Sequence, residues 1–192
     1  MERLPTTLDG PILIAPRVLG DERGFFCETY RESVFTELGI PEPMIQDNHS
    51  RSSKGIVRGM HFQIGAGASK LVRCARGAIY DVMVDLRKGS PTFGHWEGFE
   101  LTEGNMRIAY CPIGFAHGFC VLSDVADVMY KQSNYYADAT ERGIAYNDPE
   151  VGIHWPLSVE ELIPSTRDAT APRLSEIADE LPFTYHAVHA AA

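Results

Sequence analysis

The sequence predicts an all-β protein, built as a sandwich or barrel of the jelly-roll kind, and two observations support this fold class. Short segments rich in β-branched and aromatic residues recur along the chain. Turn signals separate them, for example Lys88-Gly89-Ser90-Pro91 and Glu103-Gly104-Asn105. The chain of 192 residues shows no linker, repeat or low-complexity tract. We therefore expect a single domain over residues 1–185 and a disordered tail over 186–192.

The predicted elements are mostly strands, with helices only at the periphery. Residues 24–30 predict a strand, and residues 32–38 predict a short helix that Gly39 and Pro41 end. After Asp148 the chain is rich in proline and loops, and residues 157–162 predict one more helical turn. The other predicted strands are 44–48, 57–62, 70–76, 78–86, 96–101, 106–110, 117–122 and 125–133. This series of short strands with regular turns is typical of a jelly roll.

Composition and charge exclude several functional classes. A formal net charge of −9 disfavours non-specific nucleic-acid binding, although a few local cations can still bind a small anion. No apolar stretch reaches membrane-spanning length, and the N-terminus is not a signal peptide, so we expect no membrane partner. The cysteines show no metal-binding spacing and lie in apolar stretches, which predicts buried free thiols and a cytoplasmic protein. They are Cys27, Cys74, Cys111 and Cys120.

Residues 55–77 have the spacing of a metal-binding barrel motif, but other residue types replace two of the expected metal ligands. His61 follows Gly55 at the expected distance, but Gln63 stands where a second histidine is expected. Lys70 stands where a carboxylate ligand is expected, before Gly77. A fixed ammonium repels a metal ion, whereas it can stabilise an oxyanion. The segment therefore predicts acid–base chemistry on an organic substrate, with no metal and no cofactor.

A second motif, Pro112-x-Gly114-x-x-His117, supports the same interpretation. It resembles the second motif of the cupin superfamily, and residues 55–77 resemble a degraded first motif. The resemblance implies a cupin barrel, a double-stranded β-helix jelly roll with a few short peripheral helices. Either histidine alone could be an inert, hydrogen-bonded core residue, but histidines at both motif positions favour a functional site.

Over residues 5–182 the chain resembles the dTDP-4-dehydrorhamnose 3,5-epimerase family. The resemblance implies a cytoplasmic homodimeric isomerase that acts without a cofactor on a dTDP-4-keto-6-deoxy-hexose, at C3, C5 or both. The segments that carry it are Asp21-Glu22-Arg23-Gly24-Phe25-Phe26-x-Glu28, Gln46-Asp47-Asn48, 55–63, Lys70-Leu71-Val72, 81–87, 89–94, 116–119, Tyr130, Tyr135-Tyr136, Asn147-Asp148-Pro149, 152–156 and Ser165-x-Arg167-Asp168.

The chemistry of epimerisation fits the residue types at the matching positions. A carbon beside a ketone is inverted by a base on one face and an acid on the other, with an enolate between them. His61 matches the family's proton acceptor, and histidine is the natural base near neutral pH. By resemblance Asp168 orients its ring, Tyr130 is the proton donor, and Lys70 stabilises the enolate.

Further positions match residues that bind the substrate in the family. Arginine suits the diphosphate because its donors form a rigid fork. Arg167 stands where many members have lysine, which keeps the charge but changes the donor geometry. The implied substrate-binding residues are Arg23, Glu28, Gln46, Asn48, Arg58, His117, Glu141 and Arg167.

Two strand positions leave alternatives open. Strand alternation places Asp81 on one face with Ile79 and Met83. There the carboxylate either pairs with Lys70 or His117, or it faces solvent or bonds a nearby turn. We weigh the paired alternative more and count Asp81 among the catalytic candidates. Arg58 and His61 are three residues apart, so they serve one pocket only if Gly59 permits a bulge or a strong twist.

Three other functions compete with this interpretation. Enzymes that epimerise only C3 or only C5 in secondary-metabolite pathways share almost all of these motifs. A metal-dependent cupin enzyme, such as a dioxygenase, is disfavoured by Gln63 and Lys70. A non-catalytic sugar-nucleotide-binding module is disfavoured because the candidate base, acid and oxyanion donor are all present, which is more chemistry than binding requires.

Overall fold

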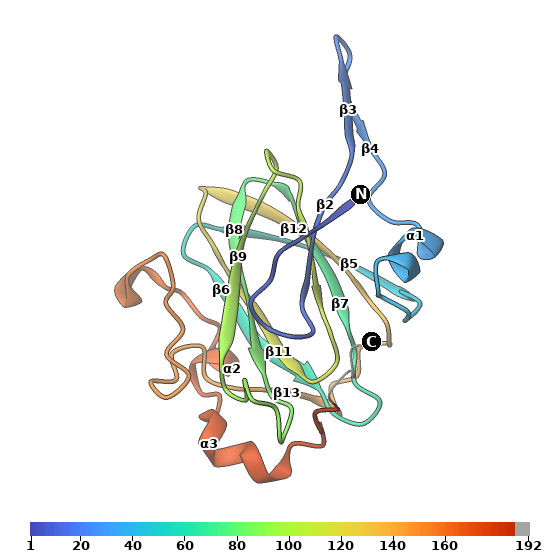
Figure 1. The fold of residues 1–192 in the computed structure, drawn as a ribbon. Helices are drawn as coiled ribbons and strands as arrows, with labels where there is room; N and C mark the ends of the chain where they lie inside the picture. Colours follow the sequence, from blue (N-terminus) through green and yellow to red (C-terminus); the bar gives the residue numbers. More distant parts are fainter. Residues whose placement is uncertain (187–192) are drawn as a thin grey trace.

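Two antiparallel sheets face each other and form the body of the protein (Figure 1), as a computed structural model describes it for residues 1–186. The first sheet has the order β1-β2-β10-β7-β12-β5 and the second has the order β13-β6-β11-β8-β9. This arrangement confirms the predicted all-β jelly roll. The first sheet comprises β1 (Glu2–Leu4), β2 (Ile12–Ala15), β10 (Ile108–Cys111), β7 (Lys70–Arg76), β12 (Val125–Gln132) and β5 (Gln46–Ser53). The second comprises β13 (Glu141–Gly143), β6 (Val57–Gln63), β11 (Phe115–Val121), β8 (Ala78–Asp85) and β9 (Trp96–Thr102).

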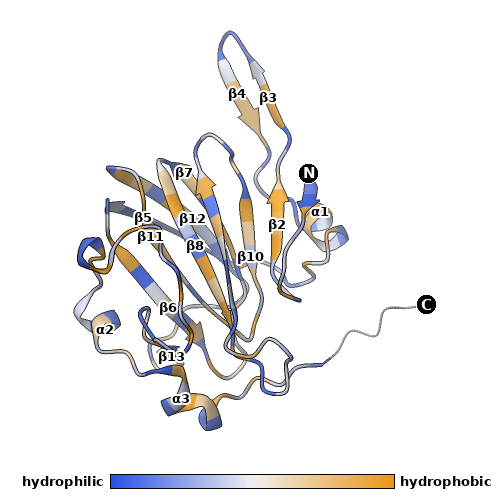
Figure 2. Ribbon diagram, turned by 60° about the vertical axis from the view of Figure 1, so that its left-hand side comes forward, coloured by the Kyte–Doolittle hydropathy of each residue, from blue (hydrophilic) through white to orange (hydrophobic). Residues whose placement is uncertain are grey.

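The remaining elements surround this body. A separate hairpin of β3 (Val18–Asp21) and β4 (Gly24–Cys27) stands clear of it (Figures 1 and 2). The helix α1 (Glu32–Glu37) packs beside the first sheet, with Phe35 buried. The C-terminal region contributes short helical segments: η1 (Val159–Glu161), α2 (Thr166–Ala169), α3 (Leu174–Ile177) and η2 (Ala178–Glu180).

Apolar side chains fill three regions because both faces of each sheet are covered. Between the sheets, Val72 and Val128 pack against Met83, Leu101 and Phe119. Outside the second sheet, the apolar residues of β6 and β8 pack against the C-terminal segments, and outside the first sheet those of β2 and β10 pack against α1. Burial on both faces explains why several strands read as continuous apolar runs rather than as alternating patterns.

Most predicted elements are present. The differences are element boundaries, short strands, and the short helical segments α2, α3 and η2, which the sequence does not predict. The strand predicted over 44–48 is β5, which continues to Ser53, and the strand predicted over 24–30 ends at Cys27. Four short strands, β1, β2, β3 and β13, were not predicted, because three or four residues carry too little periodic signal. The single domain over residues 1–185 stays a prediction. Of the predicted disordered tail, residues 187–192 lie outside the described residues.

Candidate active site

One cavity of about 440 Å³ is lined by residues of both sheets and by the C-terminal segment around α2. His61 of β6 and His117 of β11 line it from the second sheet. Lys70 of β7 and Tyr130 of β12 line it from the first sheet. Because the two sheets face each other, the candidate base His61 and the candidate acid Tyr130 belong to opposing walls of one cavity.

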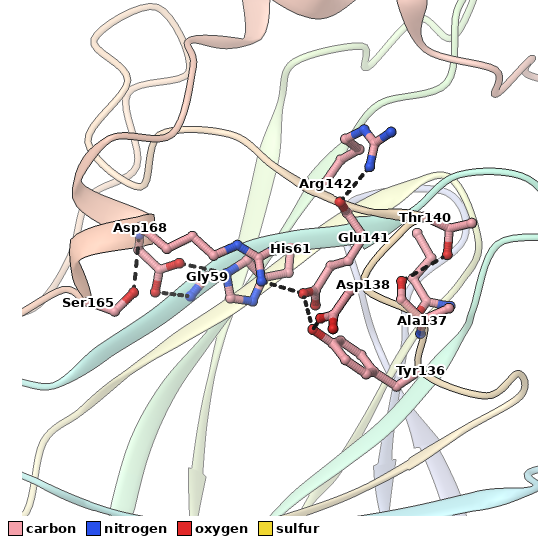
Figure 3. Close-up of polar contacts among 12 residues, drawn as sticks. Gly59, His61, Tyr136, Ala137, Asp138, Thr140, Glu141, Arg142, Ser165 and Asp168 are labelled. Atoms are coloured by element: carbon pink, nitrogen blue, oxygen red, sulfur yellow. Dashed lines mark hydrogen bonds and ion pairs between the residues drawn. The ribbon is translucent and has the colours of Figure 1, made fainter.

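His61 and Asp168 form a close pair (Figure 3). His61 Nε2 lies 2.7 Å from Asp168 Oδ1. Ser165 caps α2, since its hydroxyl accepts a hydrogen bond of 3.1 Å from the backbone N–H of Asp168, and this fixes the start of the helix. The Gly59 N–H donates a hydrogen bond of 3.5 Å to Asp168 Oδ2. An ionised carboxylate only accepts, so His61 Nε2 carries the proton of the pair and Nδ1 is left as the basic nitrogen.

The charge on Asp168 is maintained by its neighbour. Burial alone would raise the pKa of this carboxyl, but the hydrogen bond and the charge of His61, with the nearby Ser165 hydroxyl and the Gly59 N–H, hold the pKa below its ordinary value. Asp168 is therefore ionised at neutral pH, and its carboxylate can stabilise positive charge on the His61 ring. This is the partner that the resemblance assigned to His61, and the two lie 107 residues apart in the chain.

Gly59 allows Arg58 and His61 to reach the same cavity. Its φ of +133° belongs to a region that L side chains rarely adopt, and a Cβ here would lie 2.4 Å from Gly118 Cα. The pairing of β6 with β11 is irregular at this point, because the register shifts between His117 and Phe119. Strand alternation is therefore broken, as the sequence required, and both Arg58 and His61 line the cavity.

Lys70 and Tyr130 are tuned by burial. Lys70 is only 9% exposed, and its Nζ donates a hydrogen bond of 3.5 Å to the backbone oxygen of His61. Burial lowers the pKa of Lys70, while Cys111, Glu141 and Asp81 oppose that shift. Burial raises the pKa of Tyr130, so the phenol is neutral at physiological pH and has a proton to donate.

Asp81 is fully buried and pairs with a histidine. Its Oδ1 lies 2.7 Å from His117 Nε2, which confirms the paired interpretation and rules out a solvent-facing carboxylate. The residue lies inside the barrel because β8 alternates, with Ile79 and Met83 in the core between the sheets. His117 is the cross-strand partner of His61, so the two His–carboxylate pairs lie on neighbouring strands. His117 lines the cavity, whereas Asp81 lies behind it and does not.

Polar residues close the rim of the cavity. Arg58 Nε donates a hydrogen bond of 3.0 Å to Ser52 Oγ. Glu141, the first residue of β13, forms an ion pair with Arg167 and accepts a hydrogen bond of 2.9 Å from the Tyr136 hydroxyl (Figure 3). The resemblance pointed to Arg58, Glu141 and Arg167, and all three line the cavity.

Four other predicted binding residues do not line this cavity. Arg23 lies at the turn of the β3–β4 hairpin and pairs with Asp21, while Glu28 follows β4 and pairs with Arg31. Gln46 and Asn48 lie on β5, next to the cavity wall. Asn48 is the cross-strand partner of Tyr130, and Gln46 Nε2 donates a hydrogen bond of 2.9 Å to Asn48 Oδ1.

Some lining residues were not singled out from the sequence. Tyr136 and Ser165 line the cavity and belong to motifs that gave them no role. Ser52 accepts a hydrogen bond from Arg58 but does not itself line the cavity, and it lies in none of the motifs. For Ser165 a signal existed, since a serine three residues before an acidic residue is a common helix start. Among residues 1–186 no group of three or more histidine, cysteine or acidic side chains is arranged to hold a metal ion.

Comparison with known proteins identifies the family. The sequence profile described as dTDP-4-dehydrorhamnose 3,5-epimerase matches residues 5–176. The dTDP-4-dehydrorhamnose 3,5-epimerase of Salmonella typhimurium is 48% identical over 176 residues, which is 90% of this chain and 95% of that protein. A dTDP-4-dehydrorhamnose 3-epimerase of Streptomyces niveus is 43% identical over 88% of this chain and 83% of that protein.

A solved structure agrees with the sequence relatives. The crystal structure of dTDP-6-deoxy-D-glucose-3,5-epimerase RmlC from Legionella pneumophila, in complex with dTDP-4-keto-L-rhamnose, matches this chain with a TM-score of 0.93. The two sequences are 45% identical, and the match covers 97% of this chain and 99% of that chain. With two opposed sheets, a His–Asp pair and a facing tyrosine on one cavity, this chain belongs to the dTDP-4-dehydrorhamnose 3,5-epimerase family.

Proposed function

We propose that this protein is a cofactor-independent epimerase that inverts C3, C5 or both in a dTDP-4-keto-6-deoxy-hexose. His61 Nδ1 removes the proton from the carbon next to the ketone, and the C–H electrons move to form an enolate. Lys70 stabilises the oxyanion on the former carbonyl oxygen. The Tyr130 hydroxyl then protonates the carbon from the opposite face, and the ketone re-forms. Exchange with water returns His61 and Tyr130 to their starting protonation states.

One observation carries this proposal. His61 and Tyr130 come from opposing sheets onto the same cavity, and Lys70 also lines it. Inversion of a carbon requires an acid and a base on different faces, and a non-catalytic binding module has no such requirement. Arg58 and Arg167 supply cations at the rim, which suit the diphosphate of a sugar nucleotide.

The test is NMR of dTDP-4-keto-6-deoxyglucose incubated with the enzyme in D₂O. We expect deuterium at C3, C5 or both, together with inverted product, and the labelled positions identify which carbons react. Binding of the sugar nucleotide without any deuterium uptake would contradict the proposal and favour a binding module. Activity that is lost on metal removal and restored by added metal would favour a metal-dependent cupin enzyme.

We also propose that the protein is a homodimer in which each β3–β4 hairpin reaches the active site of the other protomer. Phe25 and Phe26 on this hairpin are 66% and 69% exposed, and Figure 2 shows apolar colour on both strands. Isolated two-stranded hairpins are marginally stable, so a covering surface is expected. Arg23 and Glu28, which match binding positions, are carried by this hairpin and do not line the cavity of their own chain.

Complementation between two inactive variants tests this arrangement. In a mixed dimer of Arg23→Ala and His61→Ala protomers, the site on the Arg23→Ala chain has its own His61 and receives Arg23 from its partner. We expect mixing, after unfolding and refolding together, to restore activity that neither variant has alone. Monomers in sedimentation analysis, or no recovery in mixed dimers, would refute the shared site.

The state of the cysteines bears on the cellular compartment in which the protein acts. All four cysteines are free, but Cys27 is only half-buried, so the predicted burial holds for the other three. Burial raises the pKa of Cys111 and of Cys120 to about 12, so both thiols are unreactive. Free thiols are typical of reducing compartments, and this supports our proposal of a cytoplasmic enzyme. In the described part of the chain, no helix has the length and apolar character needed to span a membrane.

A further inference from the structure

Gln63 occupies the position where a second metal-binding histidine would stand, and the structure gives its side chain a different task. It is the last residue of β6 and only 6% exposed. Its Nε2 donates a hydrogen bond of 3.4 Å to the backbone oxygen of Tyr135. Its Oε1 accepts a hydrogen bond of 3.3 Å from the backbone N–H of Ala137. The amide thus binds the 134–137 segment, which connects β12 to β13, at two points.

A second glutamine, from the other sheet, binds the same segment. Gln46 Oε1 on β5 accepts a hydrogen bond of 2.8 Å from the backbone N–H of Tyr136. Asn134 Nδ2 adds a hydrogen bond of 3.2 Å to the backbone oxygen of Gly67. Backbone groups of three consecutive residues are therefore held by side chains of β5 and β6, which belong to different sheets.

The segment carries a residue of the cavity wall. Tyr136 lines the cavity, and its hydroxyl donates to Asp138 and Glu141 (Figure 3). Glu141 in turn holds the guanidinium of Arg167 through an ion pair. These hydrogen bonds to carboxylates raise the pKa of Tyr136 to about 12, which keeps its hydroxyl a donor. The pairing of β13 with β6 holds the backbone of Glu141, and the 134–137 segment acts on the Glu141 and Arg167 side chains through the Tyr136 hydroxyl.

We propose that Gln63 is a positioning residue for substrate binding, acting through the 134–137 segment on Tyr136, Glu141 and Arg167. The inference rests on the proposed function. Residues 135–138 are exposed, so water can replace the two hydrogen bonds when the amide is removed. Loss of Gln63 therefore loosens the segment, which the hydrogen bond between Gln46 and Tyr136 still holds, and leaves the barrel folded. Gln63 itself does not line the cavity, so its effect on the substrate is indirect.

The test compares Gln63→Leu with wild type in steady-state kinetics. We expect KM for the sugar nucleotide to rise about tenfold and kcat to change less than about threefold. Hydrogen exchange of the 134–137 amides should speed up while exchange in β6 and β12 stays unchanged. Gln63→Glu keeps the acceptor for Ala137 and loses the donor to Tyr135, so an intermediate effect on KM is expected. If Gln63→Leu does not fold, the KM of Gln63→Glu tests the proposal in its place.

Asn105→Leu is the matched control. The Asn105 amide binds backbone groups of another turn, with a hydrogen bond of 2.9 Å from Nδ2 to the Glu100 oxygen, and it does not line the cavity. This variant should lower the melting temperature without changing KM. An equal rise of KM in both variants, or an unchanged KM in Gln63→Leu with faster exchange of its 134–137 segment, would overturn the proposal.

A double-mutant cycle tests whether Gln63 acts on substrate binding through Tyr136 or through a general loss of stability. If Gln63 acts through Tyr136, then Gln63→Leu changes KM by less than about threefold when Tyr136 is already phenylalanine. Independent, multiplicative effects of the two substitutions would refute the route. Affinity for dTDP, measured by calorimetry, gives the same comparison without turnover, so the inference on Gln63 can be tested even if the wild-type protein does not epimerise the proposed sugar.

Discussion

Replacement of Asp168 by asparagine tests the pair that we propose makes His61 a base. The substitution keeps the size of the side chain and removes its charge. In the native site Oδ1 accepts from His61 Nε2 at 2.7 Å, while Oδ2 accepts from the Gly59 N–H at 3.5 Å. Asparagine has only one acceptor oxygen. If that oxygen faces His61, the NH₂ group opposes the Gly59 N–H. If the amide flips, the NH₂ group donates to Nε2, and the proton of the imidazole moves to Nδ1, where it blocks the base.

The expected magnitude follows from the bond that is lost. A hydrogen bond to a charged group contributes about 1.5–3 kcal/mol, which corresponds to roughly 10- to 150-fold in rate. We expect this loss in kcat, since the carboxylate acts on the imidazolium that forms during proton removal. The affinity for dTDP should change little, because Asp168 is only 5% exposed and its polar groups are engaged by Gly59, His61 and Ser165.

The assay is the initial rate of deuterium incorporation at the sugar carbons in D₂O, at saturating substrate. Asp127→Asn is the matched control, since Asp127 also pairs with a histidine, His49 at 3.3 Å, but lies outside the cavity. Thermal unfolding verifies that both variants are folded at the assay temperature. If Asp168→Asn exchanges within about twofold of wild type, or no more slowly than Asp127→Asn, the reasoning on this pair is wrong.

Further predictions concern three other proposed catalytic groups, His61, Lys70 and Tyr130. His61→Ala should abolish exchange and turnover in a folded protein, because general base catalysis typically contributes about 10²–10⁴-fold, and near-native turnover would exclude His61 as the base. Lys70→Met should lower kcat by about 10²–10³-fold with a smaller change in KM, and it should raise the melting temperature because a buried ammonium is removed. Because burial lowers the pKa of Lys70, its ammonium loses the proton below the ordinary pKa of 10.5, and wild-type kcat should fall as pH rises through the lowered pKa. Lys70→Arg should move this fall in kcat to higher pH. If the pH profile of the variant is unmoved, the fall belongs to another group. Tyr130→Phe should leave deuterium exchange by His61 while inversion is largely lost, as time-resolved NMR in D₂O can show; equal loss of both would place Tyr130 in enolate formation.

Motif spacing and local sequence preferences predicted most of the strands. Residues 70–76 were predicted as the strand that the structure contains, and the helix after residue 31 was placed correctly, because Gly39 and Pro41 end it. Short edge strands such as β13 could not be predicted, since their pairing with β6 rather than their own sequence makes them strands.

The chemistry of the candidate site was also visible in part. Gln63 and Lys70 at metal-ligand positions indicated acid–base chemistry, because side-chain type alone excludes them as good metal ligands. Gly59 was recognised as the residue on which the geometry of Arg58 and His61 depends. What the motif could not reveal is why a glutamine stands at position 63, since its hydrogen bonds are made to residues 72 and 74 positions further along the chain.

The sequence by itself determined the fold class, the residue types of the site and the family that they resemble, because these follow from local patterns and from spacing. Only the tertiary structure decided which groups meet. It brought Asp168 to His61 across 107 residues, chose His117 rather than Lys70 as the hydrogen-bond partner of Asp81, and set Tyr130 on the sheet opposite His61. It also separated Arg23 and Glu28 from the cavity of their own chain. The physical reason is that strand pairing and sheet packing join segments distant in the chain, and the order of strands in each sheet is not written in any one segment.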